Sequence, residues 1–147
     1  MLAGTTGAAS SNLVANPSLE VDTNKDGVPD KWSAQGYGTN KFSFTKAGVV
    51  HSGSTATKLR ISSYTSGDRK LLAAYDQGGI PVSAGNRYAL SGWYRTDGTA
   101  LPVVFRKDTA GTWTYWTGAG ELAKTTTYQQ WSLTTPAVPS DTVALSF

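Results

Sequence analysis

Short stretches with the period-two alternation of β-strands recur along the whole chain, and turn residues close most of them. Asp26-Gly27, Ser52-Gly53 and Asp97-Gly98 are typical of tight turns. The ten predicted strands are Asn12–Glu20, Trp32–Tyr37, Lys41–Lys46, Ala56–Tyr64, Lys70–Gln77, Arg87–Thr96, Pro102–Lys107, Thr112–Thr117, Gln129–Thr135 and Thr142–Phe147. Short strands at this spacing predict an all-β sandwich or jelly roll.

The length of 147 residues suits one domain with a substantial core. We expect residues 12–147 to form that domain and residues 1–11 to be the remnant of a linker or tag. The opening MLAGTTGAASS lacks the charged start and the apolar stretch of a signal peptide. We expect a secreted, extracellular domain, whose secretion signal would stand on a larger parent protein. No apolar run is long enough to span a bilayer, so we expect no membrane partner.

The absence of cysteine excludes a disulfide framework, thiol catalysis and zinc sites with cysteine ligands. The net charge is +3, but the basic residues are scattered singly along the chain. A nucleic-acid surface needs clustered Lys and Arg or a known binding motif, so we expect no nucleic-acid partner.

The last predicted strand stops at Phe147 without a turn. The alternation of Val143, Leu145 and Phe147 predicts that these side chains form its buried face. A sandwich that ends here is expected to lack its final strand, which leaves an open sheet edge. Open edges pair with other chains, so we expect self-association or another segment in the gap.

One loop gathers four acidic residues against a single lysine between residues 20 and 30. Oxygen ligands stand at loop positions 1, 3, 5 and 9, a glycine at position 6 makes the sharp turn, and position 7 offers a carbonyl. Ser33 replaces the usual bidentate Glu at position 12. The spacing predicts a structural calcium site rather than a metal-free acidic turn. Its ligands are expected to be Asp22, Asn24, Asp26, Val28 and Asp30.

The strand Arg87–Thr96 sorts cleanly into two faces. Tyr88, Leu90 and Tyr94 point one way and supply the apolar bulk of a core. Trp93 and Arg95 point the other way, a combination that is awkward to bury but suits a sugar. A sugar ring packs its C–H face on an aromatic plane, and its hydroxyls or a uronate carboxylate accept from a guanidinium.

Other side chains are predicted to extend the sugar-binding surface. Trp113 and Tyr115 share a face of the strand Thr112–Thr117, which we expect in the same half of the sandwich as Trp93. Arg60 and Tyr64 share the outward face of Ala56–Tyr64, and Arg69 lies in the polar loop beside it.

Catalysis is the weaker interpretation. His51 is the only histidine, and no Gly-x-Ser-x-Gly elbow is present. Acidic residues outside the calcium loop stand mostly alone in turns, although a spatial pair such as Asp68 with Asp76 stays open. We therefore expect no enzyme activity.

The chain resembles the jelly-roll carbohydrate-binding modules with a galactose-binding-like fold. The residues that carry the likeness are Asn16-Pro-Ser-Leu-Glu20, Trp32, His51-Ser-Gly53, Pro81 through Trp93, and Trp131 before Pro136-Ala-Val-Pro139. The Asp-Gly-Val-Pro-Asp insertion looks like versions attached to actinobacterial polysaccharide deacetylases and hydrolases. Leu19 replaces the family's usual Phe, and the family's closing acidic strand is absent.

This resemblance implies a non-catalytic module that binds polysaccharide and targets an attached catalytic domain to it. It also implies a second structural calcium held in part by Glu20 and Ser52. Two alternatives stay open. One is an adhesion or structural sandwich that uses calcium for rigidity and has no glycan site, and the other is a small polysaccharide lyase or hydrolase.

Overall fold

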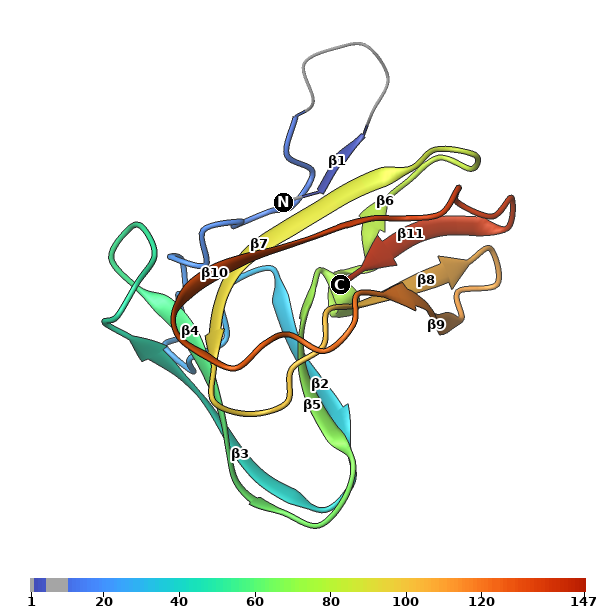
Figure 1. Ribbon diagram of the computed structural model, residues 1–147. Coiled ribbons are helices and arrows are strands. Elements are labelled where there is room, and N and C mark those ends of the chain that lie inside the picture. Colours follow the sequence, from blue (N-terminus) through green and yellow to red (C-terminus); the bar gives the residue numbers. More distant parts are fainter. Residues whose placement is uncertain (1, 5–10) are drawn as a thin grey trace. The chain divides into compact units, whose positions relative to one another are not determined.

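The computed structural model describes residues 2–4 and 11–147, and the elements among them are strands apart from one short 3-10 helix, η1 (Tyr75–Gln77) (Figure 1). The prediction of an all-β protein is confirmed. The chain divides into two compact units: unit 1 contains residues 1–14 and 78–147, and unit 2 contains residues 15–77. Each unit is described by itself below.

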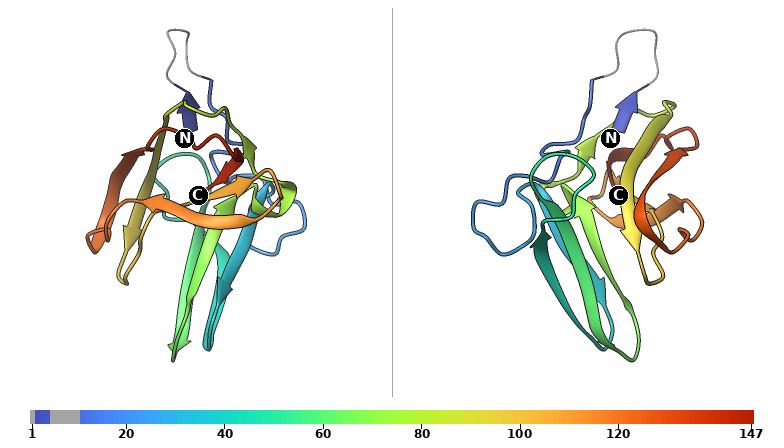
Figure 2. Two further views of the ribbon diagram at one scale, coloured as in Figure 1. Left: turned by 90° about the vertical axis from the view of Figure 1, so that its right-hand side faces the viewer. Right: turned by 60° about the vertical axis from the view of Figure 1, so that its left-hand side comes forward.

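Unit 2 is built on one long antiparallel ribbon that bends at a corner. Its strands are β2 (Trp32–Tyr37), β3 (Asn40–Ala47), β4 (Ala56–Tyr64) and β5 (Asp68–Ala73). β2 pairs with β5, and after the corner β3 continues from β2 and pairs with β4. In Figure 1 and in both views of Figure 2, the pair β2–β5 forms one part of this ribbon and the pair β3–β4 forms the other, with the corner between them. The acidic loop precedes β2.

Unit 1 contains two antiparallel sheets. The three-stranded sheet has the order β1 (Leu2–Gly4), β7 (Tyr88–Thr96), β10 (Thr125–Thr134). The four-stranded sheet has the order β6 (Ile80–Pro81), β11 (Thr142–Ser146), β8 (Val103–Asp108), β9 (Trp113–Gly118). Buried side chains come from both sheets: Tyr88, Leu90, Val104, Ala144 and Leu145.

Most predicted strands are confirmed, and β2 and β4 have the predicted bounds. The predicted strand Asn12–Glu20 is wrong, because this segment has no strand and residues 15–18 form a bend and a turn. Asn16 and Leu19 have φ of 51° and 63°, values that no strand adopts. The Asn16 side chain donates to the carbonyls of Val21 and Asp30 at 2.8 and 2.9 Å, and the Asn16 carbonyl accepts from the Trp32 indole at 3.1 Å. Side-chain bonds of this kind replace a strand ladder.

Two β-bulges change which side chains share a face. On β4 the pairing with β3 passes from Ile61 to Ser63, so Ser62 is an extra residue. Arg60 and Tyr64, predicted on one face, therefore lie on opposite faces of the hairpin. On β11 the pairing with β8 passes from Thr142 to Ala144. The extra residue Val143, predicted to be buried, is 44% exposed, whereas Leu145 and Phe147 are buried as expected.

The two ends of the chain meet the sequence expectations only in part. β11 lies between β6 and β8, so the edges of its sheet are β6 and β9. Leu2–Gly4, within the segment expected to be a linker remnant, pairs with β7 as β1. Residues 5–10 of that segment lie outside the described residues.

Candidate functional site

The exposed face of β7 and β10 in unit 1 carries a row of aromatic and polar side chains. We call it the Trp93 face and define it by Ser91, Trp93 and Arg95 of β7 with Tyr128, Gln130 and Ser132 of β10. Ser91 and Trp93 are cross-strand partners of Ser132 and Gln130, and the Arg95 guanidinium lies 5.9 Å from the centre of the Tyr128 ring. Figure 1 shows the two strands running side by side.

The burial along β7 agrees with the predicted alternation. Tyr88 and Leu90 are buried, whereas Trp93 is 48% exposed and Arg95 is exposed. The indole therefore stands on the sheet face opposite the core, where a large flat apolar surface can receive a ring.

Three members of the Trp93 face were not among the predicted site residues: Tyr128, Gln130 and Ser132. The predicted strand Gln129–Thr135 omits Tyr128, because β10 begins earlier, at Thr125, with a register irregularity before Gln129. Alternation within residues 128–132 placed these side chains on one face, but only the pairing with β7 shows which face that is.

Trp113 and Tyr115 share a face of β9 as predicted, but β9 belongs to the other sheet of unit 1. Their expected place beside Trp93 is therefore wrong. The connection between β7 and β8 passes from one sheet to the other, and local patterning does not reveal such a crossing. Tyr115 is 59% exposed with its ring edge-to-face against Phe105, its cross-strand partner, whereas Trp113 is half-buried.

The candidates on unit 2 have separate environments. Arg69 is half-buried, stacks 4.1 Å above the centre of the Phe42 ring and donates to the Asn40 side chain at 2.6 Å, so it is tied into the ribbon. Arg60 is exposed, and Tyr64 is 64% exposed on the opposite face of the hairpin.

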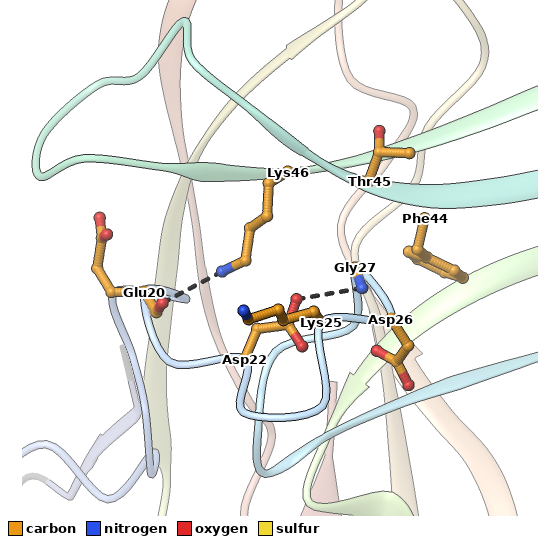
Figure 3. A pocket seen from close by; sticks show the side chains of 8 residues that line it. All are labelled: Glu20, Asp22, Lys25, Asp26, Gly27, Phe44, Thr45 and Lys46. Carbon is orange, nitrogen blue, oxygen red and sulfur yellow. Dashed lines mark hydrogen bonds between the residues drawn. The ribbon is translucent and has the colours of Figure 1, made fainter.

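A second feature of unit 2 is a hollow of about 430 Å³ beside the acidic loop, which we call the acidic hollow (Figure 3). Its lining residues are Glu20, Asp22, Lys25, Asp26, Gly27, Phe44, Thr45 and Lys46. Three predicted calcium ligands, Glu20, Asp22 and Asp26, therefore meet here, whereas Asn24, Val28, Asp30 and Ser52 do not line it.

Hydrogen bonds within the loop already engage most of its predicted oxygen ligands. Asp26 accepts from the Val28 amide at 2.8 Å and from the Asn24 side chain at 2.9 Å. Asp30 accepts from the amide and the hydroxyl of Thr23 at 3.0 and 2.5 Å. In the part of the chain that the structure describes, no three His, Cys, Asp or Glu side chains form a metal-binding group by themselves.

Asp22 is the exception. One of its oxygens, Oδ2, accepts from the Gly27 amide at 3.1 Å. The other, Oδ1, is buried and has no hydrogen-bond partner among the described residues. A buried carboxylate oxygen without a partner is costly, and a cation would satisfy it. This single oxygen of Asp22 is the feature of the loop that favours a cation.

The family resemblance implies a second calcium at Glu20 and Ser52, and the surroundings of these two residues differ from those of the loop. Glu20 Oε1 accepts from the amides of Ser54 and Thr55 at 2.9 and 3.2 Å. The Lys46 ammonium donates to the carbonyls of Leu19 and Glu20 at 2.8 and 3.2 Å, so a positive charge already stands there. Ser52 is exposed. These residues do not fit a second metal ion, because Lys46 supplies the cation.

Two carboxyl groups of this region have a lowered pKa. Amide donors from Ser54 and Thr55, the Thr55 hydroxyl and the Lys46 charge hold the pKa of Glu20 below its usual 4.5. The hydroxyl and amide of Thr23 lower the pKa of Asp30 below its usual 3.8. A depressed folded-state pKa stabilises the fold above the usual value, and that contribution is lost as the pH falls through the folded-state pKa.

We therefore expect the urea midpoint of unit 2 to fall as the pH drops below about 4.5. Glu20→Gln should flatten this dependence, because the amide cannot ionise. Glu121→Gln, an exposed position in unit 1, is the control and should leave the slope unchanged. Urea unfolding between pH 7 and pH 3 measures the effect, and equal slopes for the wild type and Glu20→Gln would contradict it.

Comparison with family models, curated proteins and solved structures finds no match to this chain. Among residues 2–4 and 11–147, no helix has the length and apolar character to cross a membrane.

Proposed function

We propose that the chain is a non-catalytic, extracellular carbohydrate-binding module of the jelly-roll type with a galactose-binding-like fold. In this function it holds an attached catalytic domain close to polysaccharide. The observation that carries the proposal is the exposed Trp93 indole, which lies on a sheet face whose reverse side is core. Its neighbours Gln130 and Arg95 offer the polar groups that sugar hydroxyls need.

Each side chain of the Trp93 face is suited by its chemistry to a different part of a sugar. The indole takes the apolar C–H face of a sugar ring and supplies most of the affinity. The Gln130 amide both donates and accepts, and the Ser91 and Ser132 hydroxyls do the same, so they match sugar hydroxyls of either orientation. Arg95 only donates. Nothing in this role requires a bond to form or break.

Trp93→Ala should weaken glycan binding by about 1–3 kcal/mol, roughly 5- to 150-fold in Kd, with little change in the melting temperature. Trp93→Phe keeps a stacking ring and should retain part of the affinity. Leu101→Ala removes an exposed apolar side chain elsewhere in unit 1 and is the matched control. The measurement is binding to a panel of soluble and insoluble glycans, by affinity electrophoresis and pull-down.

The proposal fails if no glycan of the panel is bound, or if Trp93→Ala binds as the wild type does. A loss of about 3–5 kcal/mol in stability instead would show that Trp93 belongs to the core. Shortened products after incubation with polysaccharide would favour the lyase or hydrolase alternative.

A structural or adhesion role has its own supporting observation in unit 2. Four large apolar side chains of the bent ribbon are substantially exposed: Tyr37, Phe42, Ile61 and Tyr64. Exposed apolar side chains in one region are typical of protein contacts. This alternative predicts that Tyr64→Ala disrupts an association and that Trp93→Ala does not. Light scattering of both variants distinguishes the two functions, and it also tests self-association through an open sheet edge.

We further propose that calcium rigidifies the acidic loop, with Asp22, Asn24, Asp26 and Asp30 and the Val28 carbonyl as the residues that would hold it. The support is the partnerless Oδ1 of Asp22 in the acidic hollow. Calcium has no chemical step in this function. It replaces a buried, unsatisfied oxygen with a satisfied one and stabilises the folded loop.

Calcium should raise the melting temperature by several degrees, because a ligand at 100 times its Kd stabilises by about 2.7 kcal/mol. Asp22→Asn keeps the size of the side chain and an acceptor for the Gly27 amide but removes the charge. It should abolish the calcium effect without lowering the metal-free stability. Asp97→Asn, outside the loop, should behave as the wild type. Identical melting curves with calcium and with a chelator would refute the site.

A further inference from the structure

Arg95 is the only charged residue in β7 and β10, whose sequences are YALSGWYRT and TTTYQQWSLT. The ion pairs Lys70 with Asp68 and Arg106 with Asp141 do not involve Arg95. The exposed face of this sheet therefore presents a single positive charge, and no acidic side chain of either strand offsets it.

The guanidinium of Arg95 has an aromatic neighbour on β10. It lies 5.9 Å from the centre of the Tyr128 ring, within the range of a cation–π interaction. An arginine beside an aromatic ring keeps its N–H donors available to an anion.

Arg95 and Trp93 are separated by one two-residue repeat of the strand, about 7 Å, on the same face. The ligand that this pair matches has a flat apolar face and, about one sugar ring away, a planar anion. A chain of hexuronates supplies both, because one ring stacks and the carboxylate of the next residue accepts two parallel bonds from a guanidinium. A neutral sugar uses the same indole but leaves the strongest donor on this face without a charged partner.

The end of the sheet next to Arg95 carries a hollow of about 490 Å³ lined by Thr96, Asp97, Lys124, Thr125 and Thr126. Asp97 and Lys124 carry opposite charges, so this end does not reverse the positive charge of Arg95. Its threonine hydroxyls can receive the hydroxyls of a neighbouring residue of the polymer.

We propose that the Trp93 face selects acidic polysaccharides, with a uronate ring on Trp93 and a uronate carboxylate on Arg95. This inference rests on the proposed glycan-binding function and names the ligand class of that same site.

The test pairs each acidic polymer with its neutral counterpart. The probes are polygalacturonate, alginate and glucuronoxylan, each beside the same polymer with its carboxyl groups esterified or reduced. At least one acidic form should bind about tenfold or more tightly than its neutral form, and added salt should weaken only the acidic form. Arg95→Gln should remove this preference, Arg95→Lys should restore part of it, and Trp93→Ala should weaken both forms.

Lys58→Gln is the matched control, because Lys58 is also an exposed cation on a strand but lies in unit 2 and outside the predicted sugar-binding surface. It should leave the preference intact. Equal binding of acidic and neutral forms, or an equal loss with Lys58→Gln, overturns the selection of uronates while glycan binding stands. Equal binding of single-stranded DNA, insensitive to Trp93→Ala, shows attraction to any polyanion and also overturns it. Binding to no polymer at all refutes the proposed function itself.

Discussion

Gly67→Ala is expected to lower the free energy of unfolding of unit 2 by about 2–5 kcal/mol. Gly67 lies at the corner of the bent ribbon, between β4 and β5, with a φ of +88°. A Cβ built on it would lie 1.9 Å from the carbonyl oxygen of Tyr37, the last residue of β2. A backbone oxygen cannot rotate away as a flexible side chain can, so the corner itself must open.

Hydrogen bonds of the Asn40 side chain restrain the corner against this opening. Asn40 donates its side-chain amide to the carbonyls of Tyr37 and Ser66 at 3.2 and 2.9 Å, and it accepts from Arg69 at 2.6 Å. These bonds hold the two bent segments at one separation. Moving them apart breaks the bonds together, which adds to the cost of the clash.

Gly48→Ala is the matched control, because Gly48 lies in the same unit in open space and without a positive φ. It should leave the stability nearly unchanged. Urea unfolding of both variants measures the difference. A Gly67→Ala variant as stable as Gly48→Ala would show that the connection between β4 and β5 does not rest on the end of β2 at this corner.

The strand positions were predictable from the sequence because each depends on local alternation and on turn residues at its ends. The face of Trp93 was predictable for the same reason, since no bulge interrupts the pairing of β7 from Ala89 to Tyr94 with β10. β6 was not found, because two residues, Ile80 and Pro81, are too short to show any period.

The errors have one physical origin, contacts with residues outside the segment itself. Ser62 and Val143 are extra residues only relative to the strands that they face, and nothing in their own segments marks a bulge. The sheet to which β9 belongs depends on the pairing with β8 and β11, and therefore on contacts distant in sequence. The turn at Asn16 depends on carbonyls up to fourteen positions away.

The acidic loop was partly predictable. The sharp turn expected at Gly27 is present, with a φ of +88°, and the alternation of oxygen side chains identified the residues that enclose it. The sequence did not indicate that Lys46, from β3, would stand beside Glu20. Calcium binding at the loop stays a prediction, and the contact between this loop and β3 offers a way to test it without changing any ligand.

Gly27→Ala should lower the stability of unit 2 by about 2–4 kcal/mol and should also abolish the calcium-dependent rise in melting temperature. Gly27 is buried at the tip of the loop, where a Cβ would lie 2.3 Å from the carbonyl oxygen of Phe44 on β3 (Figure 3). The variant therefore has to move the loop away from β3. That movement separates Asp22, which accepts from the Gly27 amide, from the wall of the acidic hollow that Thr45 and Lys46 form.

Gly85→Ala separates backbone strain from displacement of the loop, because Gly85 has a φ of +80° but nothing within 4 Å of its added Cβ. It should cost only the conformational part, about 1–2 kcal/mol, and should keep the full calcium effect. Thermal unfolding of both variants with calcium and with a chelator gives the comparison. A Gly27→Ala variant that is destabilised but still responds fully to calcium would show that the loop binds the ion without resting on β3. Calcium would then order the loop alone and would not link it to the ribbon.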